Sequence, residues 1–402
     1  MVTYPEDWKK QPLGKIVDIF QGGTPKTGVA SYWGGKIVWL TPGEITKIKG
    51  MYVDNSERKI TEQGLNNSSA CLLPEGAILL CTRATIGDLA IAKVPLTTNQ
   101  GFKNLVCHSD IDNVFLQYLL RTKKEEMIER AIGTTFLEIS KKELSKIIIN
   151  FPEFQEQRAI AEALNSFDTY IDDLAELIEK KRSIRDGALE DLIVGRTRIA
   201  DYCGERKEYT ISDITRTVIT GGTPSTARQE YYGGNIPWLS STEIHQKRIK
   251  KPTTYITDLG LQSSSAKMAP ERSVLIALAG QGKTRGTAAY LTRPMALNQS
   301  LAALVTNGKC NPEFLYYLIE SMYLSLRELS SGDGGRGGLN KKLIKGVTVT
   351  VPVDVAEQEA IADTLTAMDE EIEALEIERD KMIQIREGAM DDLLTGRVRL
   401  SV

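Results

Sequence analysis

The chain has 402 residues, of which 41% are hydrophobic and 26% are charged, so it is long enough to bury the cores of two or three domains. No apolar run approaches the roughly 18 residues needed to cross a bilayer, and five scattered cysteines without a Cys-x-x-Cys pair argue against a disulfide framework or a zinc site. We therefore expect a cytoplasmic protein, and its two histidines leave few groups for metal binding or general-base catalysis.

The first part of the chain alternates short apolar runs with Gly, Pro and Asn, a pattern typical of strands joined by turns. A Gly-Gly-Thr-Pro segment at residues 22–25 predicts a tight turn, in which Gly permits positive φ and Pro stiffens the backbone after it. Residues 37–40, 77–80 and 105–106 predict strands, and residues 115–132 predict a helix.

A long helix is expected next, because the chain passes a proline at 152 and reaches a helix-ending glycine only at 195. Its apolar residues recur every three or four positions from Ile160 to Ile178, which predicts a coiled-coil seam. The seam weakens at the basic run 180–182 and is expected to recover from Ile184 onward, so this stretch is either a stutter or a surface that faces a partner.

The second half of the chain repeats the first. Gly-Gly-Thr-Pro returns 199 positions later at residues 221–224, and the Trp-Leu, Glu-Ile and Asn-Gln pairs after it return in a nearly constant register. Residues 273–278 predict a strand and residues 314–329 a helix. A second long helix, offset by 201, has the same seam from Ile361 and ends at a glycine, so the sequence predicts two copies of one two-part unit with internal pseudo-twofold symmetry.

The net charge of −3 hides a segregation of charge along the chain. Residues 1–150 carry a net charge of +3 and residues 200–350 carry +7, whereas residues 151–199 carry −4 and residues 351–402 carry −9. Basic globular parts can neutralise phosphates while acidic helices stay off the duplex or face a basic protein. For the first block alone, a solvated surface explains the excess equally well.

The two seams are expected to pair with each other as antiparallel helices, which places one globular part at each end. The helical stretch of residues 160–192 then acts as a ruler of about 50 Å at 1.5 Å per residue, or at most about 14 base pairs of B-DNA. Two similar basic domains at a fixed separation are typical of a protein that reads a two-part DNA site.

One segment imitates a nucleotide-binding loop. Residues 277–284 come after a predicted strand and end in Gly-Lys-Thr, but Ala277 replaces the opening glycine and the residues after Thr284 read as turn and strand, not as a helix. We expect a basic flexible loop that reaches bases or phosphates, with a shorter counterpart around Arg83.

Polar and basic residues in the loops are the candidate DNA contacts. The Gly-Gly-Thr-Pro segments are turns or phosphate cradles, the Asn-Gln pairs read adenine or cap strand ends, and Trp39 and Trp238 are expected in the core. The candidates in the first copy are Lys26, Thr27, Thr82, Arg83, Thr85, Asn99, Gln100, Lys103, Thr134 and Thr135. Those in the second copy are Ser225, Thr226, Arg228, Gln281, Lys283, Thr284, Arg285, Asn298, Gln299 and Arg336.

Over its whole length the chain resembles the specificity subunit of type I restriction-modification systems. The resemblance rests on Gly-Gly-Thr-Pro and a subsequent Trp-Leu strand in each half, on Glu-Gln-x-x-Ile-Ala-x-x-Leu beginning at Glu156 and Glu357, and on Gly-Arg-x-Arg beginning at Gly195 and Gly396. It implies an α+β fold with two similar α/β target-recognition domains, residues 1–151 and 200–351, separated by two long antiparallel coiled-coil helices, residues 152–199 and 352–402.

The resemblance also implies a function. Such a subunit is not catalytic, needs no cofactor or metal, and recognises double-stranded DNA with a bipartite site. Two methyltransferase subunits dock on the helices and methylate adenine N6, and restriction subunits join through the complex. The alternatives are a stand-alone DNA-binding regulator or a duplicated coiled-coil scaffold.

Overall fold

The computed structural model describes residues 4–48, 50–133, 137–199, 202–280, 283–330 and 338–400. The chain divides into two compact units, one formed by Met1–Leu177 with Glu376–Val402 and the other by Ile178–Leu375. Each unit contains one globular domain and a part of each long helix. Within the described ranges, no helix combines the length and the apolar character that a membrane span requires.

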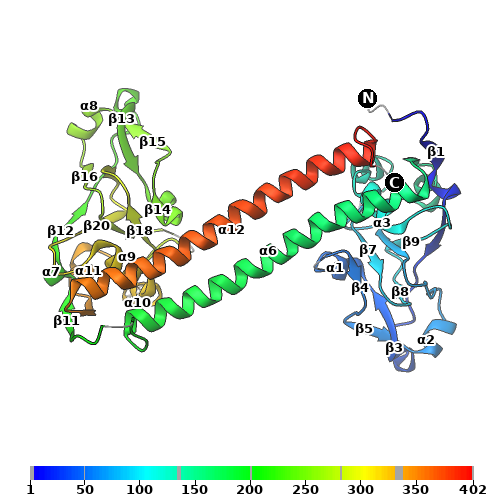
Figure 1. Ribbon diagram of the computed structural model, residues 1–402, viewed down its shortest axis with the longest axis horizontal. Coiled ribbons are helices and arrows are strands. Elements are labelled where there is room, and N and C mark those ends of the chain that lie inside the picture. The colour runs from blue at the N-terminus through cyan, green and yellow to red at the C-terminus, as the bar shows by residue number, and fades with distance from the viewer. Residues whose placement is uncertain are drawn as a thin grey trace. The chain divides into compact units, whose positions relative to one another are not determined.

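The first globular domain is built on a mixed sheet with the strand order β2-β9-β6-β7-β4, a smaller sheet ordered β5-β3-β8, and the antiparallel pair β1-β10 (Figure 1). The predicted strands at residues 37–40, 77–80 and 105–106 are confirmed as parts of β3, β6 and β9. The strands are β1 (Lys9–Pro12), β2 (Val17–Gln21), β3 (Trp33–Leu40), β4 (Tyr52–Val53), β5 (Arg58–Ile60), β6 (Ile78–Cys81), β7 (Leu89–Ala92), β8 (Thr97–Thr98), β9 (Phe102–Cys107) and β10 (Ile148–Phe151).

Short helices and 3-10 turns connect the strands of the first domain. They are the 3-10 turns η1 (Leu13–Lys15) and η2 (Ala30–Tyr32) and the helices α1 (Pro42–Ile45), α2 (Glu62–Asn66), α3 (Asn113–Arg121), α4 (Lys124–Glu129) and α5 (Lys141–Leu144). The single helix predicted for residues 115–132 is wrong, because the chain breaks into α3 and α4. The break lies at Thr122, whose hydroxyl donates to the Leu119 carbonyl at 2.7 Å and so competes with the helical backbone.

The second globular domain repeats this plan with the orders β12-β20-β17-β18-β14, β15-β13-β19-β16 and β11-β21. Its strands are β11 (Arg206–Thr210), β12 (Thr215–Thr220), β13 (Tyr232–Leu239), β14 (Arg248–Ile249), β15 (Thr254–Ile256), β16 (Lys267–Ala269), β17 (Val274–Ala277), β18 (Ala288–Leu291), β19 (Met295–Leu297), β20 (Leu301–Thr306) and β21 (Thr348–Pro352). Its helices are α7 (Ile211–Ile214), η3 (Gln229–Tyr231), η4 (Ser241–Gln246), α8 (Asp258–Gln262), α9 (Pro312–Ser321), α10 (Tyr323–Leu329) and α11 (Lys341–Lys345). The helix predicted for residues 314–329 is likewise divided, into α9 and α10.

The two long helices are α6 (Phe154–Val194) and α12 (Val355–Thr395), and each ends at a glycine with positive φ, Gly195 or Gly396, as predicted. They run side by side in opposite directions in each unit (Figure 1). In the first unit Asp168 contacts Arg386 at 2.7 Å, and in the second unit Lys181 contacts Glu371 at 2.6 Å. The mixed α+β architecture with two similar domains and antiparallel long helices is therefore confirmed.

In the predicted seam of α6, Ile160, Leu164, Leu174 and Ile178 are buried and Phe167 and Ile171 are half-buried. The expected recovery fails at Ile184 but occurs at Leu192, which is buried. The Ile184 side chain is 51% exposed and the next residue, Arg185, is buried instead. The periodicity placed an apolar residue at this point, whereas tertiary contacts select a charged one. Near its start, α6 packs on its own globular domain, since Ile160 and Leu164 belong to the core that contains the first sheet.

The repeated Glu-Gln and Gly-Arg-x-Arg motifs join the helix ends to each other. Arg399 forms bonds of 2.6 and 2.7 Å to the two carboxylate oxygens of Glu156 in the first unit. Arg198 makes the equivalent pair of bonds to Glu357 in the second unit, at 3.1 and 2.6 Å. Bidentate pairs of this kind fix direction as well as distance. The motifs that identify the repeat therefore connect the end of one long helix to the start of the other.

Candidate nucleic-acid interface

In the first unit, the Gly-Gly-Thr-Pro turn closes on the segment that leads into β9. The Gly23 amide donates to the Thr98 carbonyl at 2.8 Å, and the Thr24 hydroxyl donates to the Gln100 side-chain oxygen at 2.5 Å. Since β2 and β9 are antiparallel, the end of one strand and the start of the other lie at the same end of the sheet. The turn is thus held beside the Asn-Gln pair.

The second unit has the same arrangement. The Gly222 amide donates to the Leu297 carbonyl at 3.0 Å, and the Thr223 hydroxyl donates to the Gln299 side-chain oxygen at 2.7 Å. Two motifs separated by 76 residues in each copy therefore meet at one place.

The glycines of these turns are required by close approach and not by their backbone angles. A Cβ on Gly22 would lie 1.9 Å from the Asn99 carbonyl oxygen, and one on Gly221 would lie 1.7 Å from the Leu297 carbonyl oxygen. None of the four turn glycines has positive φ. The expectation that Gly serves here to permit positive φ is wrong, because backbone packing, invisible in a local pattern, imposes the requirement.

The asparagines and tryptophans beside the turns have structural partners. Asn99 and Asn298 each accept a hydrogen bond from the backbone amide two residues later, at 2.8 and 3.0 Å. Trp39 and Trp238 are buried, as predicted, and donate to the carbonyls of the second turn glycines at 2.9 and 3.1 Å. These side chains set the shape of the turn, whereas Gln100 and Gln299 are exposed beside it.

A third and a fourth segment reach the same end of the first sheet. The Thr82 amide donates to the Gly101 carbonyl at 2.8 Å, and the Ile139 amide donates to the Thr82 carbonyl at 3.3 Å. We call the surface formed by residues 22–27, 82–88, 99–101 and 137–139 the loop edge of the first domain. Residues 221–228, 278–280, 283–287, 298–300 and 338–339 form the loop edge of the second domain, where Leu278 bonds to Ser300 and Leu339 in the same way.

Buried charges anchor the loop edge of the first domain. The Lys103 side chain is only 3% exposed, and its ammonium lies 2.9 Å from Glu138 Oε1, while Arg83 lies 2.7 Å from Glu138 Oε2. Burial opposes ionisation of Glu138, but the hydrogen bonds from Lys103 and Arg83 prevail and lower the pKa of its carboxyl group. Lys103 is thus committed to the interior, and we assign it a structural role in place of the expected DNA contact.

Thr82 is also buried, and its hydroxyl donates to the Gly101 carbonyl at 3.1 Å. The Thr85 hydroxyl oxygen is enclosed as well. Arg83 keeps 43% of its side chain exposed and is therefore the residue of residues 82–88 best placed to reach a ligand.

The segment that imitates a nucleotide-binding loop connects β17 to the antiparallel strand β18. The segment is followed by the strand β18, as expected from the sequence, whereas a phosphate-binding loop is followed by a helix. Tyr323 donates to the Lys283 carbonyl at 3.0 Å, and His245 lies 3.2 Å from the Thr284 hydroxyl. Lys283 is exposed, while Thr284 and Arg285 are half-buried.

The remaining candidates behind the turns are exposed, namely Lys26 and Thr27 in the first copy and Ser225, Thr226 and Arg228 in the second. Arg228 lies 3.4 Å from Glu230 in a solvent-exposed pair. Four candidates, Thr134, Thr135, Gln281 and Arg336, lie outside the described residues.

Sequence reasoning missed one element beside each loop edge. Each Trp-Leu strand leads into a short turn, α1 or η4, in which a glutamate caps the first backbone amides: Glu44 bonds to Thr41, and Glu243 bonds to Ser240. The turn brings Pro42 against Gly101 and His245 against Thr284. The signal was available, because identical Trp-Leu and Glu-Ile pairs flank different residues in the two copies.

A pair of lysines comes after each loop edge and was also missed. Lys141 and Lys142 begin α5, and Lys341 and Lys342 begin α11. All four are exposed. Their recurrence at an offset of 200 marks a duplicated basic position.

Comparison with known proteins finds two matches to one family model. Residues 5–182 and 204–383 each match the type I restriction modification DNA specificity domain. A relative from Methanocaldococcus jannaschii, the type I restriction enzyme MjaIX specificity subunit, is 30% identical over 69% of this chain and 67% of its own length. The MjaVIII specificity subunit of the same organism is 22% identical over 98% of this chain and 94% of its own length.

A solved structure has the same fold. The type I restriction-modification S subunit from M. genitalium superimposes with a TM-score of 0.62 over 96% of both chains, at 19% sequence identity.

Proposed function

The chain belongs to the family of type I restriction-modification DNA specificity domains, and we propose that it reads a two-part DNA site, one part with each globular domain. The relatives are named as specificity subunits, a class that contributes recognition and not catalysis. On this proposal the globular domains are target-recognition domains and the two loop edges are their DNA-reading surfaces. The division into residues 1–151, 152–199, 200–351 and 352–402 is part of the same proposal.

One observation carries the proposal: the two loop edges share a frame and differ in the side chains that the frame presents. The Thr–Gln bond, the close-packed glycines and the asparagine turn are the same in both domains. The loop after β6 contains Arg83, whereas the loop after β17 contains Lys283 and Arg285. Two domains that recognise different half-sites require this arrangement, in which the same backbone scaffold presents different exposed loop side chains.

The exposed side chains of the loop edges are expected to make two classes of contact with DNA. Side chains that are the same in both domains, such as Gln100 and Gln299, are expected to serve a feature common to both half-sites. Arginine and lysine at the differing positions have the geometry to reach guanine edges, and the lysine pairs at the starts of α5 and α11 suit the phosphate backbone. The net positive charge of residues 1–150 and 200–350 supports this division.

The helices supply docking and spacing on this proposal. Their segments carry net charges of −4 and −9, which favours basic protein partners over DNA. We propose that two methyltransferase subunits dock there, one per repeat, that restriction subunits join through the complex, and that adenine methylation and ATP-dependent cleavage belong to those chains. We further propose that α6 and α12, each a helix of 41 residues, set the spacer between the half-sites.

Methylome sequencing tests the proposal. The chain is co-expressed with its methyltransferase partner, and the modified adenines are mapped across the host genome. We expect one motif with two short half-sites and a spacer of constant length, and native mass spectrometry should find two methyltransferase subunits for each copy of this chain.

The alternative roles predict other results. A stand-alone regulator would bind a specific site tightly without the methyltransferase, and a scaffold would leave the methylated sequence unchanged when a loop edge is altered. Either result would refute the proposal.

A further inference from the structure

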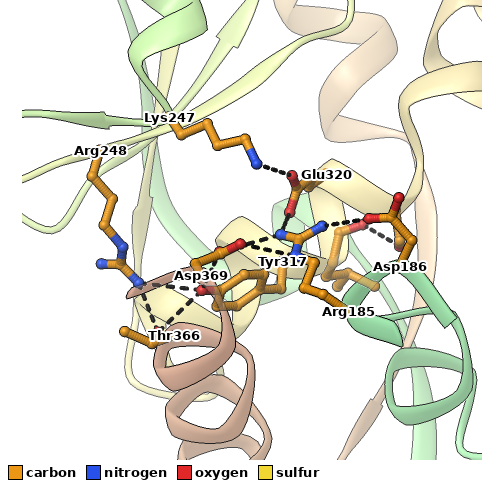
Figure 2. Close-up of polar contacts among 10 residues, drawn as sticks. Arg185, Asp186, Lys247, Arg248, Tyr317, Glu320, Thr366 and Asp369 are labelled. Carbon is orange, nitrogen blue, oxygen red and sulfur yellow. Dashed lines mark hydrogen bonds and ion pairs between the residues drawn. The ribbon is translucent and has the colours of Figure 1, made fainter. Parts of the chain in front are cut away.

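A buried arginine in the second unit connects both long helices to the globular domain. Arg185 of α6 donates from Nε to Asp369 Oδ1 of α12 at 2.9 Å and from Nη2 to Glu320 of α9 at 2.5 Å. The other oxygen of Asp369 accepts a hydrogen bond from the Tyr317 hydroxyl of α9 at 2.9 Å. Figure 2 shows Arg185 between Asp369 and Glu320, with Tyr317 beside them, and the neighbouring Asp186 also contacts the guanidinium at 3.3 Å.

The cluster places one buried guanidinium between two carboxylates that are largely enclosed. The Arg185 side chain is 5% exposed, and those of Asp369 and Glu320 are 19% and 22% exposed. Burial raises the pKa of Tyr317 to about 12, so the phenol keeps its proton and remains a donor. Arg248 adds a bond of 2.7 Å to Thr366, which lies one helical turn before Asp369.

The first unit contains the same three residue types at the equivalent places. Arg386 of α12 donates to Asp168 Oδ1 of α6 at 2.7 Å, and the Tyr118 hydroxyl of α3 donates to Asp168 Oδ2 at 2.7 Å. The roles of the helices are exchanged, because the arginine comes from α12 and the aspartate from α6. Asp168 and Arg386 correspond to Asp369 and Arg185 at the offset of 201 that relates the two helices.

We propose that these two Arg–Asp–Tyr bridges are positioning elements that fix the orientation of each recognition domain on its helices, and that they thereby restrict the chain to one spacer length. The inference rests on the proposed function, because it concerns a site with two parts. In each unit the bridge is a three-way contact, in which one carboxylate receives an arginine from the neighbouring helix and a tyrosine from the domain.

Hydrogen bonds and ion pairs depend on direction, so these bridges can fix the orientation of a recognition domain on its helices. Apolar packing tolerates small rotations, whereas a hydrogen bond weakens steeply when its donor turns away from the acceptor. A carboxylate that accepts from two different elements therefore resists rotation of either one. Adjacent base pairs differ in rotation by about 34° at roughly 10.5 base pairs per turn. A domain held rigidly on its helix therefore meets its half-site in the correct phase at one spacing, and a domain free to rotate can accept neighbouring spacings.

The bridges differ in their surroundings. In the second unit Arg248 and Glu320 complete the network, whereas the first bridge lies at a hollow of about 440 Å³ lined by Tyr52, Arg121 and Asp172 among others. The first bridge is supported by Arg121, whose guanidinium lies 3.6 Å from Asp168 Oδ2, so loss of the Tyr118 hydroxyl should loosen the first domain about as much as loss of the Tyr317 hydroxyl loosens the second.

The experiment removes one hydroxyl from each bridge in the full chain assembled with its methyltransferase. Tyr317→Phe and Tyr118→Phe are compared with wild type on a plasmid library that carries both half-sites with spacers varied by single base pairs. Tyr209→Phe removes a tyrosine hydroxyl elsewhere in the second domain. Val349→Ala weakens the core that Tyr317 also belongs to, without touching the bridge. Sequencing reports methylation at each spacer and the preferred bases of each half-site.

We expect the ratio of methylation at the optimal spacer to that at its neighbours to fall about tenfold in each bridge variant, with the preferred bases unchanged and with both control variants like wild type. Methylation that stays confined to one spacer in Tyr317→Phe and Tyr118→Phe would overturn the inference. An equal broadening in Val349→Ala would also overturn it, because loss of stability would then be the cause. If one bridge variant fails to assemble with the methyltransferase, the range of spacers methylated by the other variant tests the inference. A wild-type complex that methylates no two-part site would refute the proposed function itself, and the inference with it.

Discussion

Replacing Glu138 with Gln should selectively weaken the first domain. Glu138 balances the buried ammonium of Lys103 at 2.9 Å and also pairs with Arg83 at 2.7 Å. The substitution keeps the size and a hydrogen-bond acceptor but removes the negative charge. Lys103 would then remain in the interior without a counter-charge, which is the costly way to break a buried pair.

The distances give the size of the effect. Two unit charges at the 2.9 Å that separates Lys103 from Glu138 attract by about 6 kcal/mol at an effective dielectric constant of 20. The Glu138 side chain is 26% exposed and Arg83 is 43% exposed, so solvent screens part of this attraction. Breaking buried pairs typically costs 3–5 kcal/mol, and we take the lower end, about 3 kcal/mol, for Glu138→Gln.

Hydrogen exchange read by mass spectrometry locates the loss. About 3 kcal/mol corresponds to roughly 100-fold faster exchange of the amides in β9, while β20 of the second unit should keep its wild-type rate. Glu57→Gln is the matched control, because Glu57 pairs with Lys47 on the surface, where both side chains are 71% exposed. It should change stability by less than about 1 kcal/mol.

The effect should depend on pH in one direction. The pKa of Glu138 is lowered in the folded chain, so its contribution is fully present above the unfolded value of about 4.3 and is lost as the pH falls through the folded value. The difference between wild type and Glu138→Gln should therefore be constant near neutral pH and shrink below about pH 4. Equal exchange rates in β9 for both proteins at pH 7 would refute the reasoning.

Three further outcomes are expected. Lys283→Ala should weaken recognition of the second half-site by about 1–3 kcal/mol and leave the first unchanged in methylome sequencing. Gly221→Ala should destabilise the second unit by about 3 kcal/mol or more in thermal unfolding, because its Cβ would meet a backbone carbonyl at 1.7 Å, whereas Gly28→Ala, with open space around it, should be tolerated. Inserting four residues after both Leu174 and Leu375 adds about 6 Å of helix and should lengthen the preferred spacer by one or two base pairs.

Each of these has a result that contradicts it. Relaxed preference at both half-sites in Lys283→Ala would show that the domains do not read independently. Wild-type stability in Gly221→Ala would mean that the close approach is not essential. An unchanged spacer after the paired insertion would refute the helices as the ruler.

The fold was largely predictable because the sequence contains its plan twice. The offsets of 199 and 201 separated true motifs from chance matches, and the apolar spacing from Ile160 to Ile178 predicted a seam whose residues are buried or half-buried. Glycines at 195 and 396 end the long helices as their positions indicated. These features are local or periodic, so one sequence is sufficient to find them.

The details that failed depend on contacts between distant segments. Lys103 was expected to reach DNA because it is charged and lies just after the Asn-Gln pair, but Glu138, 35 residues later, holds it inside. Ile184 fits the apolar spacing yet is exposed, while Arg185 is buried because two carboxylates from α9 and α12 surround it. Gly221 is needed for a carbonyl 76 residues away. Pattern along the chain does not report such partners.

Exchange of one globular domain tests the central claim most directly. A chain in which residues 206–352 are replaced by residues 9–151 would contain two copies of the first reader on the original helices. Expressed with the methyltransferase, it should methylate a site made of two inverted copies of the first half-site, with the second half-site lost and the spacer close to that of the original chain. A methylated sequence that still contains the second half-site would contradict the account.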